Sequence, residues 1–488
     1  MPHITKKIFL YTKICPRKGW LLRNRTDPAV LTLGEQFRIE QGLEIGERAR
    51  DLFCGGVLVE QRATDDAAQR TQQLLADPAV QVIFEAAFLV NDYAARADVL
   101  VRNRDAWDLI EVKSKTVKAL ESKKDREDLI DDMAYTYLIL GKSGPAPASV
   151  RLMLLSDQFR LGMDNVRLFE TIDYTGPVRE RAMEFAENLD PFGQLTSRPD
   201  APAIKYLPDC KKCDFFTECI PDTGACTIFH IPRLSAKQFQ DLDSRGIFHV
   251  RDIPPGFRLT DTQQRPVECM RSGKIVTDPG LKRELAQIRW PAHYLDFETT
   301  QTAYPLYPDT GPYEKIPVQY SVHTCTQCGE IVQHREFLAN PAQDCRRELA
   351  ESLIAHLDGD GSVLSYSSFE KQVISGLKKQ LPDLAGPLDA ILGRLVDLIL
   401  CSKCVSHPEF RGSNSIKDVL PVLVPEMSYK DMPVANGDDA LATFAYMALG
   451  RFSPEECEQK REELLRYCEQ DTLAMVRIHK EFEKLANR

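Results

Sequence analysis

The sequence lacks the features that mark membrane-spanning and secreted proteins. Within its 488 residues, no uninterrupted apolar run approaches the roughly 18 residues that suggest a transmembrane helix. The amino terminus carries Lys6 and Lys7 without a long apolar run behind them, so we expect no secretory signal. These absences predict a cytoplasmic protein with no membrane partner.

An excess of positive charge is also lacking. The chain has 62 Lys and Arg residues against 72 Asp and Glu residues, for a net charge of −10. This balance argues against a protein that coats nucleic acid by bulk electrostatics, so any nucleic-acid contact must use local basic patches. The contents of 43% hydrophobic and 27% charged residues are ordinary for globular chains and exclude wholesale disorder.

The chain shows no tandem repeat and no low-complexity tail, but its patterning changes along its length. We predict an amino-terminal αβ domain over 1–228, a small polar helical connector over 229–288, and a second αβ domain over 289–488. Strands are expected at 81–90, 96–102, 108–113, 293–299, 317–324, 330–338 and 362–366, and helices at 35–53, 121–141, 369–380 and 453–487.

A first candidate site lies on two short strands of the amino-terminal half. Side chains alternate across a strand, so Glu111 and Lys113 point to one face, to which Asp98 can bring a second carboxylate. Two carboxylates hold Mg²⁺ through oxygen ligands, and the ammonium helps to orient or deprotonate an attacking water. The alternative is a solvated hairpin with an ion pair.

This segment resembles the core of the PD-(D/E)xK nucleases, particularly the RecB-like branch. The resemblance implies a restriction-endonuclease-like mixed sheet, metal binding by Asp98 and Glu111, and a catalytic role for Lys113. RecB-like enzymes usually add a metal-binding His on an upstream helix. The corresponding segment, 42–50, has no His, and Glu47 is the substitute that the resemblance suggests. The family's Gln-x3-Tyr motif is also missing near Tyr135.

A second feature is a compact group of cysteines, which needs an explanation because disulfides are rare in the cytoplasm. Cys210, Cys213 and Cys219 are closely spaced, and Cys226 follows. Four thiolates could hold zinc or a 4Fe–4S cluster. With Cys15 as the fourth ligand, the pattern resembles the iron–sulfur staple of AddB-type and CRISPR-associated RecB-like exonucleases, which clips the two ends of the domain together.

A third constellation lies in the carboxy-terminal half. Asp296 and Glu298 share one face of a strand, and the i, i+4 spacing places Tyr467 and Asp471 on one face of a helix that opens with a capping box at Ser453. This arrangement resembles the DEDDy branch of RNase H-like 3′→5′ exonucleases. Carboxylates of that kind hold two divalent ions that clamp a scissile phosphate.

The family's middle motif, an Asn followed by an aromatic–Asp pair, corresponds here to the segment 365–370, in which Glu370 replaces the Asp. The resemblance implies Mg²⁺ or Mn²⁺ at Asp296, Glu298, Glu370 and Asp471, and a water positioned by Tyr467. The segments 312–323 and 412–417 also look like a bacterial family of RNase H-like exonuclease domains often found behind a RecB-like half.

Two further features are weaker. Cys325 and Cys328, and later Cys401 and Cys404, each form a CxxC pair that suggests zinc, which the family pattern does not require. The segment 234–256 resembles helix-hairpin-helix modules, which contact phosphates through backbone amides, although a plain helical linker fits equally well.

The sequence therefore predicts a metal-dependent hydrolase that cleaves the phosphodiester bonds of DNA at two sites, in repair, recombination or phage defence. Single-stranded DNA or DNA ends are the expected substrates, with RNA as an alternative. A second hypothesis keeps only the carboxy-terminal site active and makes the amino-terminal half a DNA clamp. A third is a non-catalytic iron–sulfur module that binds nucleic acid.

Overall fold

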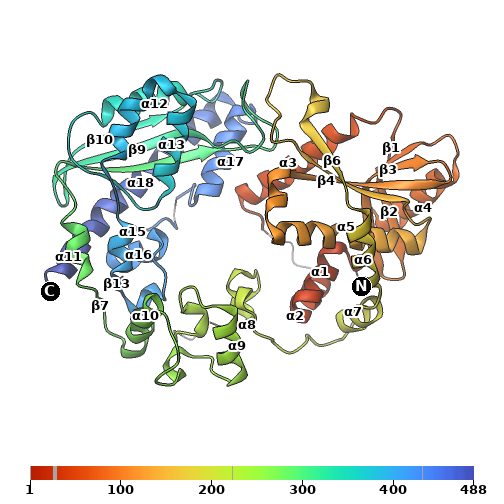
Figure 1. Cartoon of the computed structure of the whole chain (residues 1–488), viewed down its shortest axis with the longest axis horizontal. Helices are drawn as coiled ribbons and strands as arrows, with labels where there is room; N and C mark the ends of the chain where they lie inside the picture. The colour runs from red at the N-terminus through yellow and green to blue at the C-terminus, as the bar shows by residue number, and fades with distance from the viewer. Residues whose placement is uncertain (1, 26–29, 222–223, 431) are drawn as a thin grey trace. The chain divides into compact units, whose positions relative to one another are not determined.

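The computed structural model describes residues 2–25, 30–221, 224–430 and 432–488. The chain divides into two compact units, each of mixed αβ character (Figure 1). Unit 1 comprises Met1–Lys205 and Gln301–Glu314, and unit 2 comprises Tyr206–Thr300 and Lys315–Arg488. Among the described helices, none is both long and apolar enough to cross a membrane.

Unit 1 is built on a six-stranded mixed sheet in the order β1-β2-β3-β4-β5-β6. Its strands are β1 (Val57–Leu58), β2 (Val82–Val90), β3 (Tyr93–Asn103), β4 (Ala106–Thr116), β5 (Ser149–Leu155) and β6 (Phe169–Asp173). The β2–β3, β3–β4 and β5–β6 pairs are antiparallel, whereas β1–β2 and β4–β5 are parallel. The helices that surround it include α3 (Leu33–Arg50), α4 (Thr64–Ala76), α5 (Lys123–Ser143) and α6 (Thr175–Ala186).

The predicted hairpin that carries the first candidate site is confirmed. Strands β3 and β4 pair in antiparallel register, with Arg102 opposite Trp107 and Asn103 opposite Ala106. The turn is therefore shorter than expected and consists of Arg104 and Asp105, with Arg104 in the left-handed region at φ 56°. The apolar residues that flank the site are mostly buried, because Leu100 and Leu109 share a core with α5 whereas Val99 and Ile110 cluster with Ala49 of α3.

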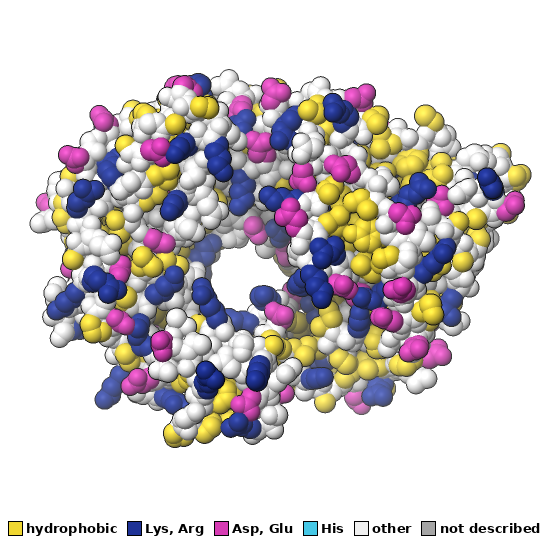
Figure 2. Space-filling model, in the orientation of Figure 1, with side chains coloured by type: hydrophobic (Ala, Val, Ile, Leu, Met, Phe, Trp, Pro, Cys, Tyr) yellow, Lys and Arg dark blue, Asp and Glu magenta, His cyan; other side chains and the backbone are white. Residues whose placement is uncertain are grey.

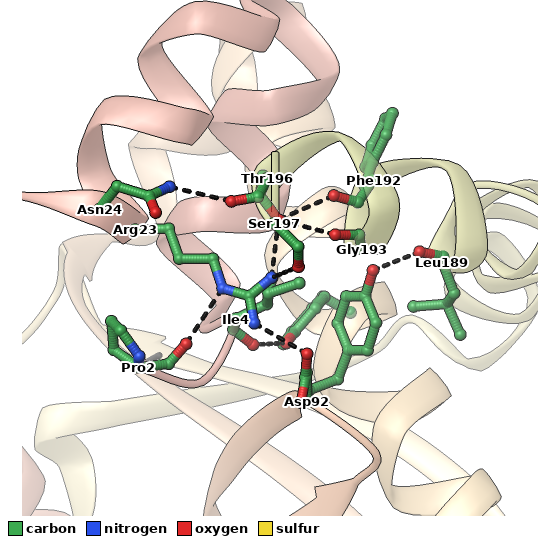
Figure 3. Close-up of polar contacts among 12 residues, drawn as sticks. Pro2, Ile4, Arg23, Asn24, Asp92, Leu189, Phe192, Gly193, Thr196 and Ser197 are labelled. Carbon is green, nitrogen blue, oxygen red and sulfur yellow. Dashed lines mark hydrogen bonds and ion pairs between the residues drawn. The ribbon is translucent and has the colours of Figure 1, made fainter. Parts of the chain in front are cut away.

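Of the amino-terminal helices α1 (Lys6–Ile14) and α2 (Pro16–Asn24), α2 is fastened to α7 (Leu189–Thr196) by Arg23 and by Asn24, whose Nδ2 donates to Thr196 O at 2.9 Å (Figure 3). The guanidinium of Arg23, which is 1% exposed, donates to Thr196 Oγ1 and Ser197 Oγ at 2.9 Å each. It also donates to Pro2 O at 3.1 Å and pairs with Asp92 at 2.8 Å. Arg23 thus joins Pro2 to Ser197, which lie near opposite ends of the stretch 1–205 of unit 1.

Unit 2 contains a five-stranded mixed sheet in the order β10-β9-β8-β11-β12. Its strands are β8 (Ala292–Thr300), β9 (Ile316–Gln327), β10 (Glu330–Leu338), β11 (Val363–Ser365) and β12 (Leu395–Asp397). The β9–β10 and β8–β9 pairs are antiparallel, and β11 runs parallel to both β8 and β12. The predicted strands at 293–299, 317–324, 330–338 and 362–366 are confirmed.

The central strand β8 lies beneath the long helix α18 (Pro454–Ala486), which packs against both β8 and β9. The helix begins where the sequence predicts, because the Ser453 side chain accepts from the Glu456 backbone and Glu456 reaches back to the Ser453 backbone. Helices α12 (Arg346–His356) and α13 (Phe369–Gln380) belong to the same unit, and residues from both contribute to its core.

The cysteine-rich segment and the predicted connector share a small apolar core within unit 2. Helices α9 (Ala236–Ser244) and α10 (Asp261–Ser272) contribute to it, and Cys210, Cys219 and Cys226 pack against it. Residues 206–228 thus belong with the connector and not with residues 1–205.

On the face seen in Figure 2, basic side chains are interspersed with acidic and neutral ones.

Candidate active site

A group of carboxylates converges where β8 meets α18 in unit 2. Asp296, Glu298 and Asp471 each offer a carboxylate oxygen, and these oxygens all lie within 4.8 Å of one another. Asp296 and Glu298 alternate on the strand with buried Leu295 and Phe297, so both project from the face that α18 covers. Asp471 lies on the helix and is 8% exposed. The structure therefore brings together residues separated by most of unit 2.

The pKa of every carboxyl in this group is raised. Burial is the largest cause for Asp296, followed by the charges of Asp471, Glu298 and Glu370. Burial and Asp471 likewise raise the pKa of Glu298 well above its usual value. Burial raises the pKa of Asp471 to about 6, although Tyr429, Lys417 and Tyr467 offset part of this effect. When ionised, these carboxylates accumulate negative charge that the nearby Lys417 ammonium compensates only in part.

Glu370 and Tyr467, both predicted from sequence, lie beside this group. Glu370 is 3% exposed at the start of α13, where Ser367 Oγ donates to Glu370 Oε2 at 3.3 Å. Burial, together with nearby Asp397 and Asp471, raises the pKa of Glu370 to about 7. Tyr467 is buried on α18, one turn before Asp471, and burial followed by Asp471 raises the pKa of its phenol.

Three residues beside the carboxylates were not expected from sequence to take part in the site. Tyr429 donates from its hydroxyl to Asp471 Oδ1 at 2.6 Å, and Cys468 Sγ lies 3.5 Å from Asp296 Oδ2. The Nζ of Lys417 (α16, Ile416–Leu423) lies 5.8 Å from the Tyr429 ring centroid and 5.9 Å from that of Tyr467. Lys417 falls within a segment that carried the resemblance, but no local pattern in the sequence identifies Tyr429 or Cys468.

The donor set of this group fits hard divalent cations. Every candidate ligand is a carboxylate oxygen, which is the donor that Mg²⁺ and Mn²⁺ prefer. Buried like charges this close are costly unless a cation or a proton neutralises them, and the raised pKa values express that cost. The residues that would hold the ions are Asp296, Glu298, Asp471 and Glu370.

The other predicted group, in unit 1, has a different balance of charge. Glu111 and Lys113 share one face of β4 as expected, with Lys113 Nζ 2.8 Å from Glu111 Oε1. Asp98 lies next to Val99, which pairs with Ile110, and its Oδ2 accepts a 2.7 Å hydrogen bond from the Val112 backbone. The structure thus brings Asp98, Glu111 and Lys113 together.

Two further residues complete this group and were missed in the sequence. Lys6, from the first turn of α1, lies 2.7 Å from Glu111 Oε1 and 2.9 Å from Asp132 Oδ2. Lys113 also pairs with Asp132, on α5, at 2.6 Å. Asp132 lies in the segment 131–135 examined for the absent Gln-x3-Tyr motif, whereas nothing in the sequence connects Lys6 with residues about a hundred positions away.

Two ammonium groups therefore compensate the carboxylates of unit 1. Burial and the Asp98 charge raise the pKa of Glu111 to about 7. Burial alone would raise the pKa of Asp132, but Lys113 and Lys6 hold it below its usual value. Glu111 Oε2 is nevertheless buried with no hydrogen-bond partner among the described residues. This oxygen is therefore available to coordinate a cation. This group fits a metal less fully than the one in unit 2.

Glu47, the suggested substitute for the RecB-like His, lies apart from this group. Its side chain is 69% exposed and pairs with Arg50 at 3.8 Å. A different acid lies nearer: Glu85, at φ 55°, stands opposite Asp98 between the Phe84–Val99 and Ala86–Ala97 pairs of β2 and β3. Burial raises the pKa of Glu85, and Glu111 and Lys6 are among the charges that act on it.

The predicted cluster cysteines fall in both units. Cys15 lies between α1 and α2 of unit 1, whereas Cys210, Cys213 and Cys219 lie in unit 2. The Cys213 amide donates to Cys210 O at 2.9 Å and the Cys219 amide to Phe215 O at 3.0 Å, so the segment is tightly turned. All four thiols are half-buried.

Two comparisons with known proteins each cover part of the chain. A family model described as a domain of unknown function, DUF2779, matches residues 293–415. This range includes Asp296, Glu298 and Glu370 and ends before α18. The chain is also 24% identical over 213 residues to the uncharacterized protein MG366 of Mycoplasma genitalium, covering 38% of this chain and 31% of the relative. It thus spans about a third of the length of that curated relative.

Proposed function

We propose that unit 2 is a metal-dependent exonuclease that hydrolyses phosphodiester bonds in DNA that is single-stranded or has free ends. The observation that carries the proposal is the convergence of Asp296, Glu298 and Asp471 within 4.8 Å. The D-x-E and Y-x3-D motifs that resemble DEDDy exonucleases supply the same residues. The position of Asp296 and Glu298 on the central strand of a mixed sheet supports an RNase H-like domain.

The proposed roles follow from position and charge. Divalent ions held by the carboxylates would neutralise the charge that develops on the scissile phosphate. Tyr467, buried beside Asp471, would orient the attacking water, and Tyr429 fixes one oxygen of Asp471. The Lys417 charge lowers the pKa of both Glu298 and Asp471, and its ammonium would add positive charge beside a bound phosphate.

The test is nuclease activity on end-labelled single-stranded DNA with Mn²⁺ or Mg²⁺. We expect Asp296→Asn and Glu298→Gln to lower the rate at least about 100-fold, as when charge stabilisation of a transition state is lost. Glu426→Gln is the matched control, because Glu426 is exposed in a loop of the same unit. A parallel assay on labelled RNA separates the two substrate classes.

Full activity in Asp296→Asn and Glu298→Gln would refute the proposal. DNA binding without cleavage in the wild-type protein would favour the non-catalytic alternative. A rate that falls in Asp98→Asn and Glu111→Gln but not in Asp296→Asn would move the activity to unit 1.

A second candidate function is favoured by the unpartnered Glu111 Oε2 in unit 1. One cation there, with Asp98 and Glu111 as ligands and Lys113 beside it, would make a second nuclease site of the RecB-like kind. The pairing of Lys6 and Lys113 with Glu111 favours the alternative, in which unit 1 binds DNA without cutting it. The nuclease rate of Glu111→Gln, compared with that of the exposed control Glu121→Gln, distinguishes these functions. Only a second nuclease site predicts a lower rate in Glu111→Gln than in the control.

We also propose that Cys15, Cys210, Cys213 and Cys219 ligate a 4Fe–4S cluster. The tight turns between Cys210 and Cys219, and their half-buried thiols, support a cluster site. Protein purified without oxygen should then absorb broadly near roughly 400 nm, as thiolate-ligated iron–sulfur groups do. A colourless protein that contains zinc would assign the cysteines, with Cys226, to the other cofactor.

A further inference from the structure

A second group of metal-ligating side chains lies in unit 2, on the strands next to the carboxylates. It consists of His323 on β9, His334 on β10 and Glu469 on α18, whose ligand atoms all lie within 4.8 Å of one another. His323 stands opposite His334 in the antiparallel ladder, and their rings stack with centroids 4.4 Å apart. The proposed function uses none of the three residues.

Hydroxyl groups hold one nitrogen of each imidazole. Thr472 Oγ1 lies 2.8 Å from His323 Nδ1, and Ser321 Oγ lies 2.9 Å from His334 Nε2. The two hydroxyls lie 2.8 Å from each other, so they form one continuous chain behind the rings. Within the described part of the protein, His323 Nε2 and His334 Nδ1 have no hydrogen-bond partner. Metal-binding histidines regularly have an outer hydrogen-bond partner on the second ring nitrogen, which fixes the ring orientation, and the two hydroxyls can serve as such partners.

The distances suit a small first-row ion. Two ligand atoms bound tetrahedrally to zinc at about 2.0–2.1 Å lie about 3.3 Å from each other. His334 Nδ1 and Glu469 Oε1 are 3.8 Å apart, too far for a hydrogen bond and close to that separation. The His334 side chain is 24% exposed and that of Glu469 is 45% exposed, so an ion can enter from solvent.

This group is separate from the carboxylate site in position and in chemistry. Asp296 on β8 is opposite Ser321 on β9, and His334 lies one strand further, about 10 Å from β8 at the usual strand spacing. Two imidazoles with one carboxylate favour Zn²⁺ and similar transition ions, whereas an all-oxygen set favours Mg²⁺ or Mn²⁺.

We propose that His323, His334 and Glu469 form a binding site for a transition-metal ion of the Zn²⁺ class, which fastens α18 to β9 and β10. Solvent or Glu336, whose pKa is influenced by the His334 and Glu469 charges, is available for the remaining coordination position. The ion would join side chains from three elements, β9, β10 and α18, that already pack together.

The test uses the full-length protein freed of metal by chelator dialysis and kept in excess Mg²⁺, which occupies the carboxylate site. Zn²⁺ is titrated in competition with a chromophoric chelator. We expect the wild-type protein to bind one equivalent more than His334→Ala and Glu469→Gln. We expect Thr472→Val to weaken that equivalent about 10- to 100-fold, as loss of an outer hydrogen bond does.

Gln333→Ala is the matched control, because Gln333 is the exposed neighbour of His334 on β10. Zn²⁺ should raise the unfolding temperature of the wild type and of Gln333→Ala more than that of His334→Ala. Co²⁺ bound in place of Zn²⁺ at the histidine site should show no thiolate charge-transfer band. This absence distinguishes the site from a metal site made of cysteines. Equal stoichiometry and affinity in wild type, His334→Ala and Glu469→Gln would overturn the proposal.

Discussion

Tyr429 and Asp471 are joined by a 2.6 Å hydrogen bond in which the phenol donates to Oδ1. The bond connects the loop that follows α16 to the middle of α18, and both residues are buried. It leaves Asp471 with one oxygen engaged by the protein while its carboxylate still converges with Asp296 and Glu298. Tyr429 is therefore a positioning residue for the carboxylate group.

Replacing Tyr429 with Phe should lower nuclease activity about 10- to 100-fold, the usual cost of losing a hydrogen bond behind a metal ligand. Because the change loosens Asp471 without removing its charge, more Mn²⁺ should be needed to reach half-maximal rate. A metal titration of the initial rate measures both effects. Tyr137→Phe, on α5 of unit 1, serves as the control. An unchanged metal requirement in Tyr429→Phe would contradict this role.

The raised pKa values in unit 2 predict how metal-free protein responds to pH. Burial is the largest cause that raises the pKa of Asp471 to about 6 and that of Glu370 to about 7. Ordinary values in an unfolded chain are about 4. The stability that the protonated carboxyls of Asp471 and Glu370 contribute is therefore fully present below about pH 4, and it is lost as the pH rises through about 6 to 7.

Urea unfolding in EDTA at pH 5 and pH 7.5 measures this effect. We expect Glu370→Gln and Asp471→Asn to show a smaller loss of stability between the two values than the wild type, because each lacks one titrating group. Mg²⁺ should restore stability at pH 7.5, since it neutralises the carboxylates without a proton. If the wild type and both variants lose the same free energy of unfolding between pH 5 and pH 7.5, uncompensated charge on these carboxylates does not limit stability.

Local periodicity accounts for the parts of the site that were predicted. Alternation along β8 places Asp296 and Glu298 on one face, and helical spacing aligns Tyr467 with Asp471. The β3–β4 hairpin similarly places Glu111 and Lys113 together. Each of these pairs required only the regular repeat of one strand or helix, because that repeat fixes where side chains point. Glu370, in contrast, was predicted from the resemblance.

The residues that were missed depend on tertiary packing. Lys6 reaches Glu111 only because α1 packs against α5, and Tyr429 comes from an irregular loop. Glu47 was expected at the unit 1 site from the resemblance to RecB-like enzymes, but its side chain is 69% exposed. Glu85 lies nearer to the group, at a positive φ within β2 that no periodic pattern predicts.

The double pairing of Lys6 predicts a cost for its removal. Lys6→Met leaves Glu111, which is 1% exposed, with one ammonium instead of two, and should destabilise the protein by about 3 kcal/mol. The penalty should shrink at pH 5, because Glu111 can then accept a proton. Urea unfolding at pH 7.5 and pH 5 measures the change, with exposed Lys7→Met as the neighbouring control. Equal penalties at the two pH values would argue that Lys6 acts through packing alone.

The contacts of Arg23 predict that it stabilises unit 1 by joining distant segments. Arg23→Met removes a buried guanidinium that serves Pro2, Asp92, Thr196 and Ser197 (Figure 3). We expect a loss of about 2 kcal/mol, because Met cannot replace the hydrogen bonds of the buried guanidinium and the buried Thr196 hydroxyl loses this donor, whereas exposed Asp92 can turn to solvent. Arg23→Lys should recover only part of it, since an ammonium lacks the planar fork that reaches these groups together.

Chemical denaturation gives the free energy, and limited proteolysis reports whether α1 and α2 detach before the rest of unit 1 unfolds. Arg198→Met is the control, because Arg198 is exposed just beyond α7. Early cleavage after α2 in Arg23→Met, but not in Arg198→Met, would show that the arginine closes this unit. Unchanged stability in Arg23→Met would instead mean that the packing of Phe9 against Tyr135 and Phe185 is enough to hold α1 in place.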